Sequence, residues 1–165
     1  MDQAKPVKIT DVKVAYTKAE HYCAYQERAH QEVRDKLYEW GLWPEAVENI
    51  IVQLIGGNFI NEERFANAYA KGKFNQKGWG KIKIKQGLKF KKVPEVLIKK
   101  ALQGINADDY LLTLKKVISK KDLLLTEKDA FKRKYKLQQY AIGRGFESDL
   151  VADVLGDPDS YRNLD

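Results

Sequence analysis

Residues 33–51 read VRDKLYEWGLWPEAVENII, and this stretch decides the fold because its apolar pattern occurs three times in the chain. The second copy is residues 84–102, IKQGLKFKKVPEVLIKKAL, and the third is residues 137–155, LQQYAIGRGFESDLVADVL. The shared apolar positions are, copy by copy, Val33, Leu37, Leu42, Ala46, Val47, Ile50 and Ile51; Ile84, Leu88, Val93, Leu97, Ile98, Ala101 and Leu102; and Leu137, Ala141, Phe146, Leu150, Val151, Val154 and Leu155. A complete set in three copies predicts a repeat architecture.

Each copy predicts two helices. The first half places apolar residues four apart, and the second half shows the i, i+1, i+4, i+5 pattern of one buried helix face. Pro44 and Pro94 lie near the start of the second helix, where proline is tolerated. Gly41 and Gly145 precede that helix and suit a tight turn. We expect the repeated apolar positions to form the core, with Leu37, Ile51, Leu88 and Leu102 all buried.

A further helix precedes each copy. Asn61 lies four residues before Phe65, and Asn106 lies four residues before Tyr110. Acidic residues follow closely after each asparagine, an arrangement typical of a helix N-terminus. The predicted fold class is therefore all-α, with three tandem three-helix repeats and nine principal helices. We place the segments at 1–14 (a flexible N-terminal segment), 15–56, 58–104 and 106–156 (the repeats) and 157–165 (a flexible tail that includes Tyr161).

The sequence KIKIK, from Lys81 to Lys85, alternates as a strand would and by itself favours a strand. The repeat register instead predicts a helix over 79–90, since the equivalent residues of the other copies have helical spacing. On a continuous helix, Lys77, Lys81, Lys85 and Lys89 fall four residues apart on one outward row.

Charge is distributed unevenly around a formal net charge of +7. Residues 71–100 hold eleven lysines and a single acidic residue, whereas residues 1–70 and 137–165 are net acidic. Such a basic zone attracts polyanions or acidic partners. A lysine-rich face that only keeps the protein soluble is the alternative.

Several function classes find no support in the sequence. We see no P-loop, HExxH or nucleophile-elbow motif, and His21 and His30 are too far apart for an i, i+4 metal pair. We therefore expect no enzyme, no cofactor and no metal ion. The sequence contains no run of about 18 apolar residues, so we expect no membrane span. The single cysteine, Cys23, cannot form an internal disulfide, so we expect a cytoplasmic protein.

Two stretches carry a family resemblance. Residues 57–66, GNFINEERFA, resemble the RecX signature of a glycine, an apolar pair, an acidic turn and Arg-Phe-Ala. Residues 78–84, GWGKIKI, resemble the glycine-rich turn and basic helix start of the same family. Upstream, the pattern from Arg28 to Leu37 is also similar, and the resemblance runs from about Ala15 to Leu155.

The resemblance implies an elongated, curved helical array that binds the RecA filament and inhibits its growth, ATP hydrolysis and recombinase activity. It also implies that the basic face lies near single- or double-stranded DNA, and we expect a monomer. The alternative is a basic helical nucleic-acid-binding protein that acts independently of RecA. The candidate contact residues are Lys77, Trp79, Lys81, Lys85, Lys89, Lys92, Arg64, Lys128, Lys132, Lys136 and Arg144. For Trp79, core packing and an interface role remain equally open.

Overall fold

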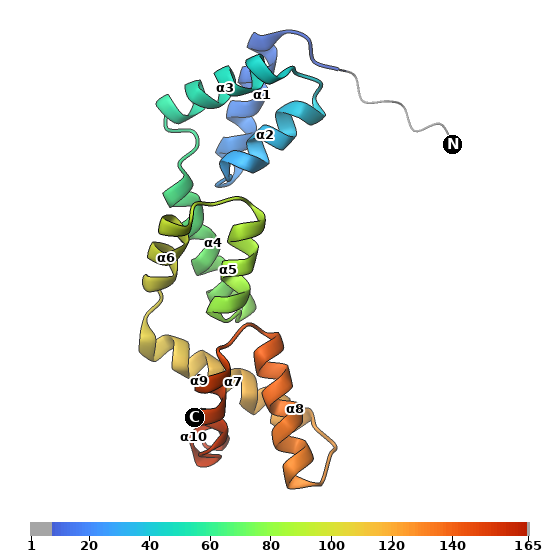
Figure 1. Cartoon of the computed structure of the whole chain (residues 1–165), viewed down its shortest axis with the longest axis vertical. Helices are drawn as coiled ribbons and strands as arrows, with labels where there is room; N and C mark the ends of the chain where they lie inside the picture. Colours follow the sequence, from blue (N-terminus) through green and yellow to red (C-terminus); the bar gives the residue numbers. More distant parts are fainter. Residues whose placement is uncertain (1–7, 165) are drawn as a thin grey trace, which may run out of the picture.

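The computed structural model describes residues 8–164, and over these residues the chain forms ten helices and no strand. Three groups of helices are stacked along one long axis (Figure 1). Repeat 1 holds α1 (Val12–Tyr25), α2 (His30–Glu39) and α3 (Pro44–Gly56); repeat 2 holds α4 (Glu62–Lys77), α5 (Lys81–Phe90) and α6 (Glu95–Gln103); repeat 3 holds α7 (Ala107–Leu124), α8 (Ala130–Gly143), α9 (Ser148–Leu155) and the short α10 (Asp159–Arg162). The prediction of an all-α repeat protein is confirmed.

The lysine–isoleucine segment is helical, as the repeat register predicts. Ile84 and Leu88 are fully buried on the inner face of α5, and this burial overrides the strand-like alternation. The helix begins at Lys81 rather than at residue 79, because Gly78 ends α4 in the left-handed region with φ 65°. Lys77 therefore belongs to α4 and does not continue the row of lysines on α5.

The predicted helix starts are confirmed by side-chain caps. The side chain of Asn61 accepts a hydrogen bond of 2.9 Å from the Arg64 amide, and that of Asn106 accepts one of 3.0 Å from the Asp109 amide. Each cap satisfies one of the backbone N–H groups that a helix N-terminus leaves without a partner.

The repeated apolar positions form the core, with three exceptions. Leu97, Leu102 and Leu150 are only partly buried, whereas the other repeated positions are buried. The prediction that Leu102 is buried is therefore wrong, because its side chain is only partly buried. Leu102 lies in the last turn of α6 and lines an open groove, so its outer side has no helix to cover it.

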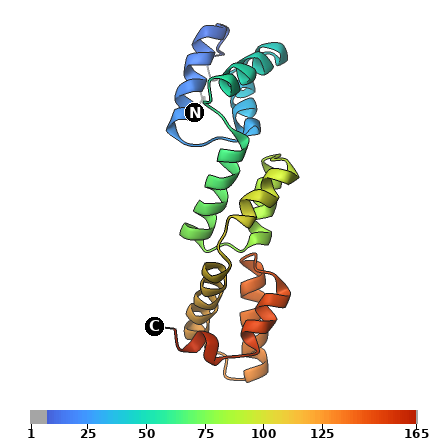
Figure 2. The same cartoon turned by 90° about the vertical axis from the view of Figure 1, so that its left-hand side faces the viewer.

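The core is divided between the repeats in an unequal way. Repeat 1 has its own hydrophobic cluster, whereas repeats 2 and 3 share a continuous one. Among the described residues, Ala29 is the one buried apolar residue of repeat 1 that belongs to the shared cluster. Figure 2 shows α4 leading out of repeat 1 into the rest of the array. Repeats 2 and 3 therefore form one packed body to which repeat 1 is joined.

Backbone contacts hold repeat 2 to repeat 3. The amide of Gly80 donates a hydrogen bond of 2.9 Å to the Arg144 carbonyl, and the amide of Ile82 donates one of 2.9 Å to the Gly145 carbonyl. Glycine at positions 80 and 145 permits this approach, because a Cβ atom on Gly80 or Gly145 would collide with the opposite repeat.

The N-terminal segment is ordered where the structure describes it, which corrects part of the prediction for residues 1–14. Residues 1–7 lie outside the described residues. The Ile9 amide donates a hydrogen bond of 2.8 Å to the carbonyl of Trp40, and Ile9 packs against the core of repeat 1. Trp40 holds in repeat 1 the position that Arg144 holds in repeat 3. The segment thus bonds to repeat 1 in the way that Gly80 bonds to repeat 3.

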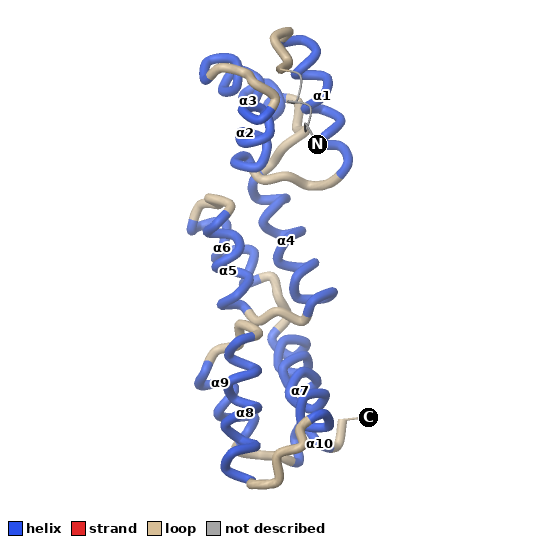
Figure 3. The backbone as a smooth tube through the Cα atoms, turned by 90° about the vertical axis from the view of Figure 1, so that its right-hand side faces the viewer, coloured by secondary structure: helices blue, strands red, loops and turns tan. Residues whose placement is uncertain are grey.

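The end of the chain also differs from the prediction of a flexible tail over 157–165. Residues 159–162 form α10, which packs beside α7 (Figure 3). Tyr161 is 3% exposed and joins the shared core, and Arg162 lies 3.5 Å from Asp122. One apolar side chain in a four-residue helix leaves no periodicity in the sequence, so a pattern search misses it.

Candidate functional site: a basic groove in repeat 2

A groove of about 320 Å³ runs between α5 and α6. The side chains of Ile98 and Leu102 contribute apolar surface to it, and Lys81, Lys85 and Lys99 contribute positive charge. Glu95, at the start of α6, is the acidic residue among those that line the groove. The arrangement offers a partner both apolar contact and several ammonium groups.

Glu95 holds two of the lysines of α5. Its carboxylate lies 3.3 Å from the Lys85 ammonium and 3.8 Å from the Lys89 ammonium. All three side chains are largely exposed, so each pair contributes at most about 1 kcal/mol to stability and exchanges readily with solvent. An incoming anion can therefore replace Glu95 as the partner of these lysines at little cost.

Lys81 has a structural role as well as a charge. Its amide donates a hydrogen bond of 3.0 Å to the Tyr110 hydroxyl, and its ammonium lies 4.9 Å from the centre of the Tyr110 ring. The Tyr110 hydroxyl in turn donates to Glu147, and burial, followed by this bond, raises the pKa of Tyr110 far above its ordinary value. Lys81 is thus partly buried at the contact between repeats 2 and 3, and the prediction that it points outward is only partly right.

Trp79 lies between two lysines and the shared core. The ammonium groups of Lys73 and Lys83 lie 4.8 Å and 4.5 Å from the centre of its indole ring, and the ring is partly buried. Of the two roles that the sequence leaves open, packing is the one visible in the structure. Lys77 lies exposed in the last turn of α4, and Lys92 lies exposed in the turn between α5 and α6.

The two candidate arginines are bound within the chain. Arg64 lies 2.6 Å from Glu27 of repeat 1 and also donates to Asn58 and to the Phe59 carbonyl. The Arg144 side chain donates to the carbonyl of Lys77 in repeat 2. Both side chains therefore connect neighbouring repeats.

The lysines of repeat 3 lie away from the groove. Lys132 and Lys136 are on the first half of α8, and Lys128 precedes that helix. The other end of α8 meets repeat 2, and a helix of fourteen residues is about 20 Å long. These three candidate contact residues therefore do not continue the row of lysines on α5. Lys136 pairs with Glu127 at 3.2 Å.

Three family models match the chain one after another. The model described as the first three-helix domain of RecX matches residues 15–54, the second matches 61–102 and the third matches 108–155. The chain belongs to the RecX family. A regulatory protein RecX of Bacillus licheniformis is 29% identical over 158 residues, which are 94% of this chain and 59% of that protein. One of Clostridium acetobutylicum is 31% identical over 140 residues, which are 82% and 64%.

Solved RecX structures share the fold. The crystal structure of RecX from Lactobacillus salivarius superposes with a TM-score of 0.81 at 23% identity, and covers 90% of this chain and 96% of that one. A crystal structure of a regulatory protein RecX has a TM-score of 0.81 at 27% identity, and covers 88% and 71%. The chain spans about three fifths of the length of the two sequence relatives named above.

Lys99 is a residue of the groove that our sequence reasoning missed in this RecX family chain. It stands four residues after Glu95 on α6, so the two side chains share one face of the helix. The spacing of charged residues along the second helix of the repeat is the sequence signal that places Lys99 on the same face as Glu95.

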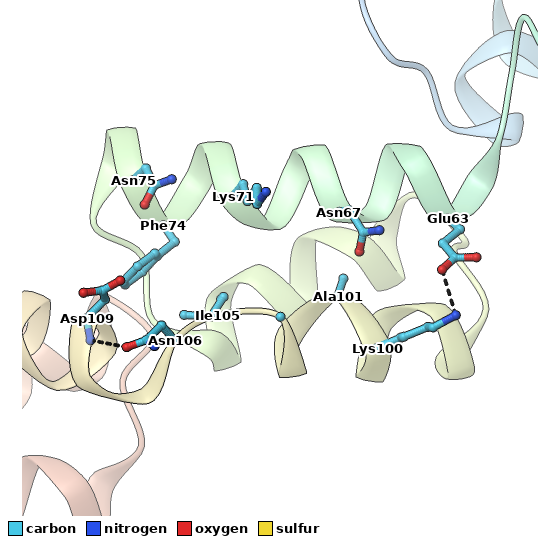
Figure 4. Close-up of a pocket in the computed structure, with 11 residues that line it drawn as sticks. Glu63, Asn67, Lys71, Phe74, Asn75, Lys100, Ala101, Ile105, Asn106 and Asp109 are labelled. Atoms are coloured by element: carbon cyan, nitrogen blue, oxygen red, sulfur yellow. Dashed lines mark hydrogen bonds and ion pairs between the residues drawn. The ribbon is translucent and has the colours of Figure 1, made fainter.

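A second groove, of about 460 Å³, lies between α4 and α6 (Figure 4). Asn67, Lys71 and Asn75 follow one another along α4 four residues apart, and an ion pair of 2.8 Å between Glu63 and Lys100 crosses one end. Its lining mixes both signs of charge. The groove between α5 and α6 carries more lysine than acid and is therefore the stronger candidate for an anionic partner.

The contact between repeats 1 and 2 is polar. Glu62 of α4 accepts a hydrogen bond of 3.2 Å from the His30 amide, and its other oxygen lies 3.2 Å from Nδ1 of the His30 ring. Burial raises the pKa of Glu62 above its ordinary value, and the neighbouring His30 opposes this rise. His30 therefore lies at the start of α2 and takes part in a contact between repeats. Within residues 8–164 no cluster of His, Cys, Asp or Glu could hold a metal ion, and no helix is long and apolar enough to span a membrane.

Proposed function

We propose that this RecX family chain is a negative regulator of RecA, which binds the RecA–ssDNA filament and inhibits its growth, ATP hydrolysis and recombinase activity. Family membership supports a regulatory role. The observation that carries the proposal is the basic groove between α5 and α6, in a repeat whose residues 71–100 hold eleven lysines and one acidic residue.

The groove can bind an acidic protein surface or a phosphate backbone. Lys85, Lys89 and Lys99 lie along its rim, and the exposed pairs with Glu95 are weak enough to be displaced. An anionic partner that replaces Glu95 gains charge-assisted contacts, and the apolar surface of Ile98 and Leu102 adds to them. The elongated array would allow further contacts on either side of the groove.

The role we propose is non-catalytic. Glu62 and Tyr110, two polar groups whose pKa burial raises, are used in contacts between repeats rather than in an open pocket. A candidate acid or base would need access to a substrate. Regulation by binding therefore fits these groups better than chemistry does.

The same lysines also favour an alternative, a nucleic-acid-binding protein that acts independently of RecA. Each lysine that neutralises a phosphate should contribute about 0.9 to the log–log salt slope on a duplex and about 0.7 on a single strand. Both functions are therefore salt-sensitive. They differ in one respect: a RecA regulator lowers RecA ATP hydrolysis at amounts well below those needed to coat the DNA.

The test replaces the three rim lysines together, as Lys85→Gln, Lys89→Gln and Lys99→Gln. Lys81 is left unchanged because its side chain packs on Tyr110. We expect the melting profile to be preserved and the inhibition of RecA ATP hydrolysis on single-stranded DNA to be lost. The matched control is Lys13→Gln, Lys71→Gln and Lys116→Gln, which removes the same charge from exposed positions outside the groove.

The outcomes separate the alternatives. If the groove variant loses inhibition and the control variant keeps it, the groove contacts the filament. Equal loss in both variants would mean that net charge alone matters. A groove variant that inhibits as well as the parent would refute the proposed contact, and loss of DNA binding with full inhibition would assign the groove to nucleic acid.

A further inference from the structure

Repeat 3 ends in an exposed apolar surface around the connection between α7 and α8. Leu123 is 84% exposed, Leu124 77%, Phe131 80% and Tyr135 58%. We call these four side chains the α7–α8 end. The connection forms one extremity of the long axis, at the bottom of Figures 1 and 3. Four large apolar side chains exposed within thirteen residues indicate an interaction surface.

The α7–α8 end is built on a rigid support. Arg133 of α8 donates to the carbonyl of Asp122 at 2.7 Å and to its carboxylate at 2.7 Å. The same guanidinium donates to the carbonyls of Leu125 and Glu127, in the connection itself. These bonds hold the end of α7 against the start of α8. The exposed apolar side chains are therefore presented by an ordered backbone.

The corresponding edge of the other repeats is the place where the next repeat packs. In repeat 1 this edge contains Ala29, which is fully buried, and in repeat 2 it contains Gly80, which contacts Gly145. At each contact, a side chain of the following repeat accepts a bond from the first amide of the second helix. Glu62 does so for α2, and Tyr110, which is bound to Glu147, does so for α5.

In repeat 3 the large apolar side chains at the corresponding edge are exposed over residues 8–164. The start of α8 is capped from within, because Asp129 accepts a bond of 3.0 Å from the Lys132 amide. The α7–α8 end is the connection between the first and second helices of repeat 3, as the two edges used inside the chain are in repeats 1 and 2.

The charge around the α7–α8 end is positive. Of its acidic groups, Asp122 binds Arg133, Glu127 binds Lys136 and Asp129 caps the start of α8. Four exposed lysines lie near it, and in the described part of the chain none of them has a carboxylate within 4.0 Å: Lys120, Lys128, Lys132 and Lys134. An apolar centre with a lysine rim is complementary to an apolar surface with an acidic rim.

We propose that the α7–α8 end is the docking surface for an acidic amphipathic helix of another protein. The apolar face of that helix packs on Leu124, Phe131 and their neighbours, and its carboxylates pair with the surrounding lysines. One contact inside the chain already places a carboxylate, that of Glu62, at such an edge, which supports the same chemistry for an outside partner. The inference does not depend on the proposed function, because it concerns a different part of the molecule.

A second copy of the chain fits this surface less well. Two lysine-rimmed ends repel each other. In a head-to-tail contact, the turn between α2 and α3 of a second copy would have to dock on this surface. The Ile9 amide already donates to the Trp40 carbonyl of that turn, and Lys8 lies against Gly41. Single-stranded nucleic acid could stack on Phe131 and Tyr135. It would leave the two exposed leucines without an apolar partner.

The test measures fluorescence anisotropy of a labelled helical peptide of about 20 residues, with leucines on one face and glutamates on the other. We expect the full chain to bind it, and the variant Leu124→Ala with Phe131→Ala to bind about tenfold more weakly or not at all. The melting profile should not change, because both side chains are mostly exposed. The matched control is Phe90→Ala, which removes a phenylalanine that is 87% exposed on α5 and should leave binding intact.

Four further measurements complete the test. A peptide with lysines in place of the glutamates should not bind, and hydrogen exchange should slow around residues 123–135 when the acidic peptide is added. Absence of peptide binding, or binding that the double variant leaves unchanged, overturns the proposal. So does a double variant that loses oligothymidylate binding but keeps the peptide, which assigns the surface to nucleic acid. Self-association that the double variant abolishes assigns it to a second copy.

Discussion

The backbone of Gly80 lies directly against the backbone of Gly145, so closely that a Cβ atom on Gly80 would come within 3.0 Å of the Gly145 carbonyl. Gly145 also has a φ of 98°, which side chains other than glycine adopt with strain. The two residues come from different repeats, and the amide of Gly80 bonds to the turn that contains Gly145. The continuous core of repeats 2 and 3 therefore depends on a backbone contact that no larger residue can reproduce.

The change Gly80→Ala should separate the two repeats. The added carbon meets backbone atoms, which cannot move aside as a flexible side chain could. We expect the free energy of unfolding, measured by urea titration, to fall by about 1–3 kcal/mol. The control is Gly72→Ala in α4, where a Cβ meets nothing within 4 Å and should be neutral or slightly stabilising. Equal midpoints for Gly80→Ala and the parent would contradict the close contact.

Lys92 is the counterpart in repeat 2 of Gly41 and Gly145. The three residues share one position in the repeat, and their φ angles are 59°, 97° and 98°. A residue with a side chain costs about 1–2 kcal/mol in the left-handed region. We therefore expect Lys92→Gly to raise the free energy of unfolding by about 1 kcal/mol, observed as a higher melting temperature. Lys92→Ala removes the charge but keeps the strain, so a gain in both variants would point to charge instead.

Leu88 and Leu102 test the repeat register against the observed burial. Leu88 is fully buried, and Leu88→Ala should lower the free energy of unfolding by about 2–5 kcal/mol. Leu102 lines the open groove beside α5, so Leu102→Ala should cost less than Leu88→Ala. Thermal melts of the two variants provide the comparison. A larger loss for Leu102→Ala would show that the groove is closed in solution.

Much of the fold was accessible from the sequence, because apolar spacing reports directly on which helix faces are buried. The helical state of Lys81–Lys85 followed from the repeat even though its local alternation favours a strand. The caps at Asn61 and Asn106 were also recognisable, since a helix start has its own residue pattern.

The contacts of the charged residues were much less accessible. Charge and spacing do not reveal that Arg64 binds Glu27, thirty-seven residues away, or that Lys81 packs on Tyr110. Such pairs depend on how repeats stack, and the stacking is set by backbone contacts such as that of Gly80. The candidate site could therefore be assigned to repeat 2 from its lysine content, whereas the groove and Lys99 required the structure.

Cys23 offers a test of the separation between the two cores. It is 6% exposed in the core of repeat 1, and burial raises the pKa of its thiol to about 11. Because the folded pKa lies above the ordinary value near 9, the buried thiol stabilises repeat 1 fully below pH 9. This stabilisation should be lost as the pH rises from about 9 to about 11.

We therefore expect alkaline conditions to lower the urea concentration at which repeat 1 unfolds. Unfolding of repeat 1 can be followed by the reaction of its single thiol with a disulfide reagent. At pH 8 a thiol of pKa about 11 is a thiolate in only about one molecule in a thousand, so labelling should occur through opening of repeat 1. Labelling at urea concentrations that leave repeats 2 and 3 helical would demonstrate separate unfolding. In Cys23→Ala, circular dichroism should show a smaller alkaline loss, because the thiol is removed and groups such as Tyr22, whose pKa burial also raises, remain. A thiol that reacts only when the whole chain unfolds would instead mean that the two cores are cooperative.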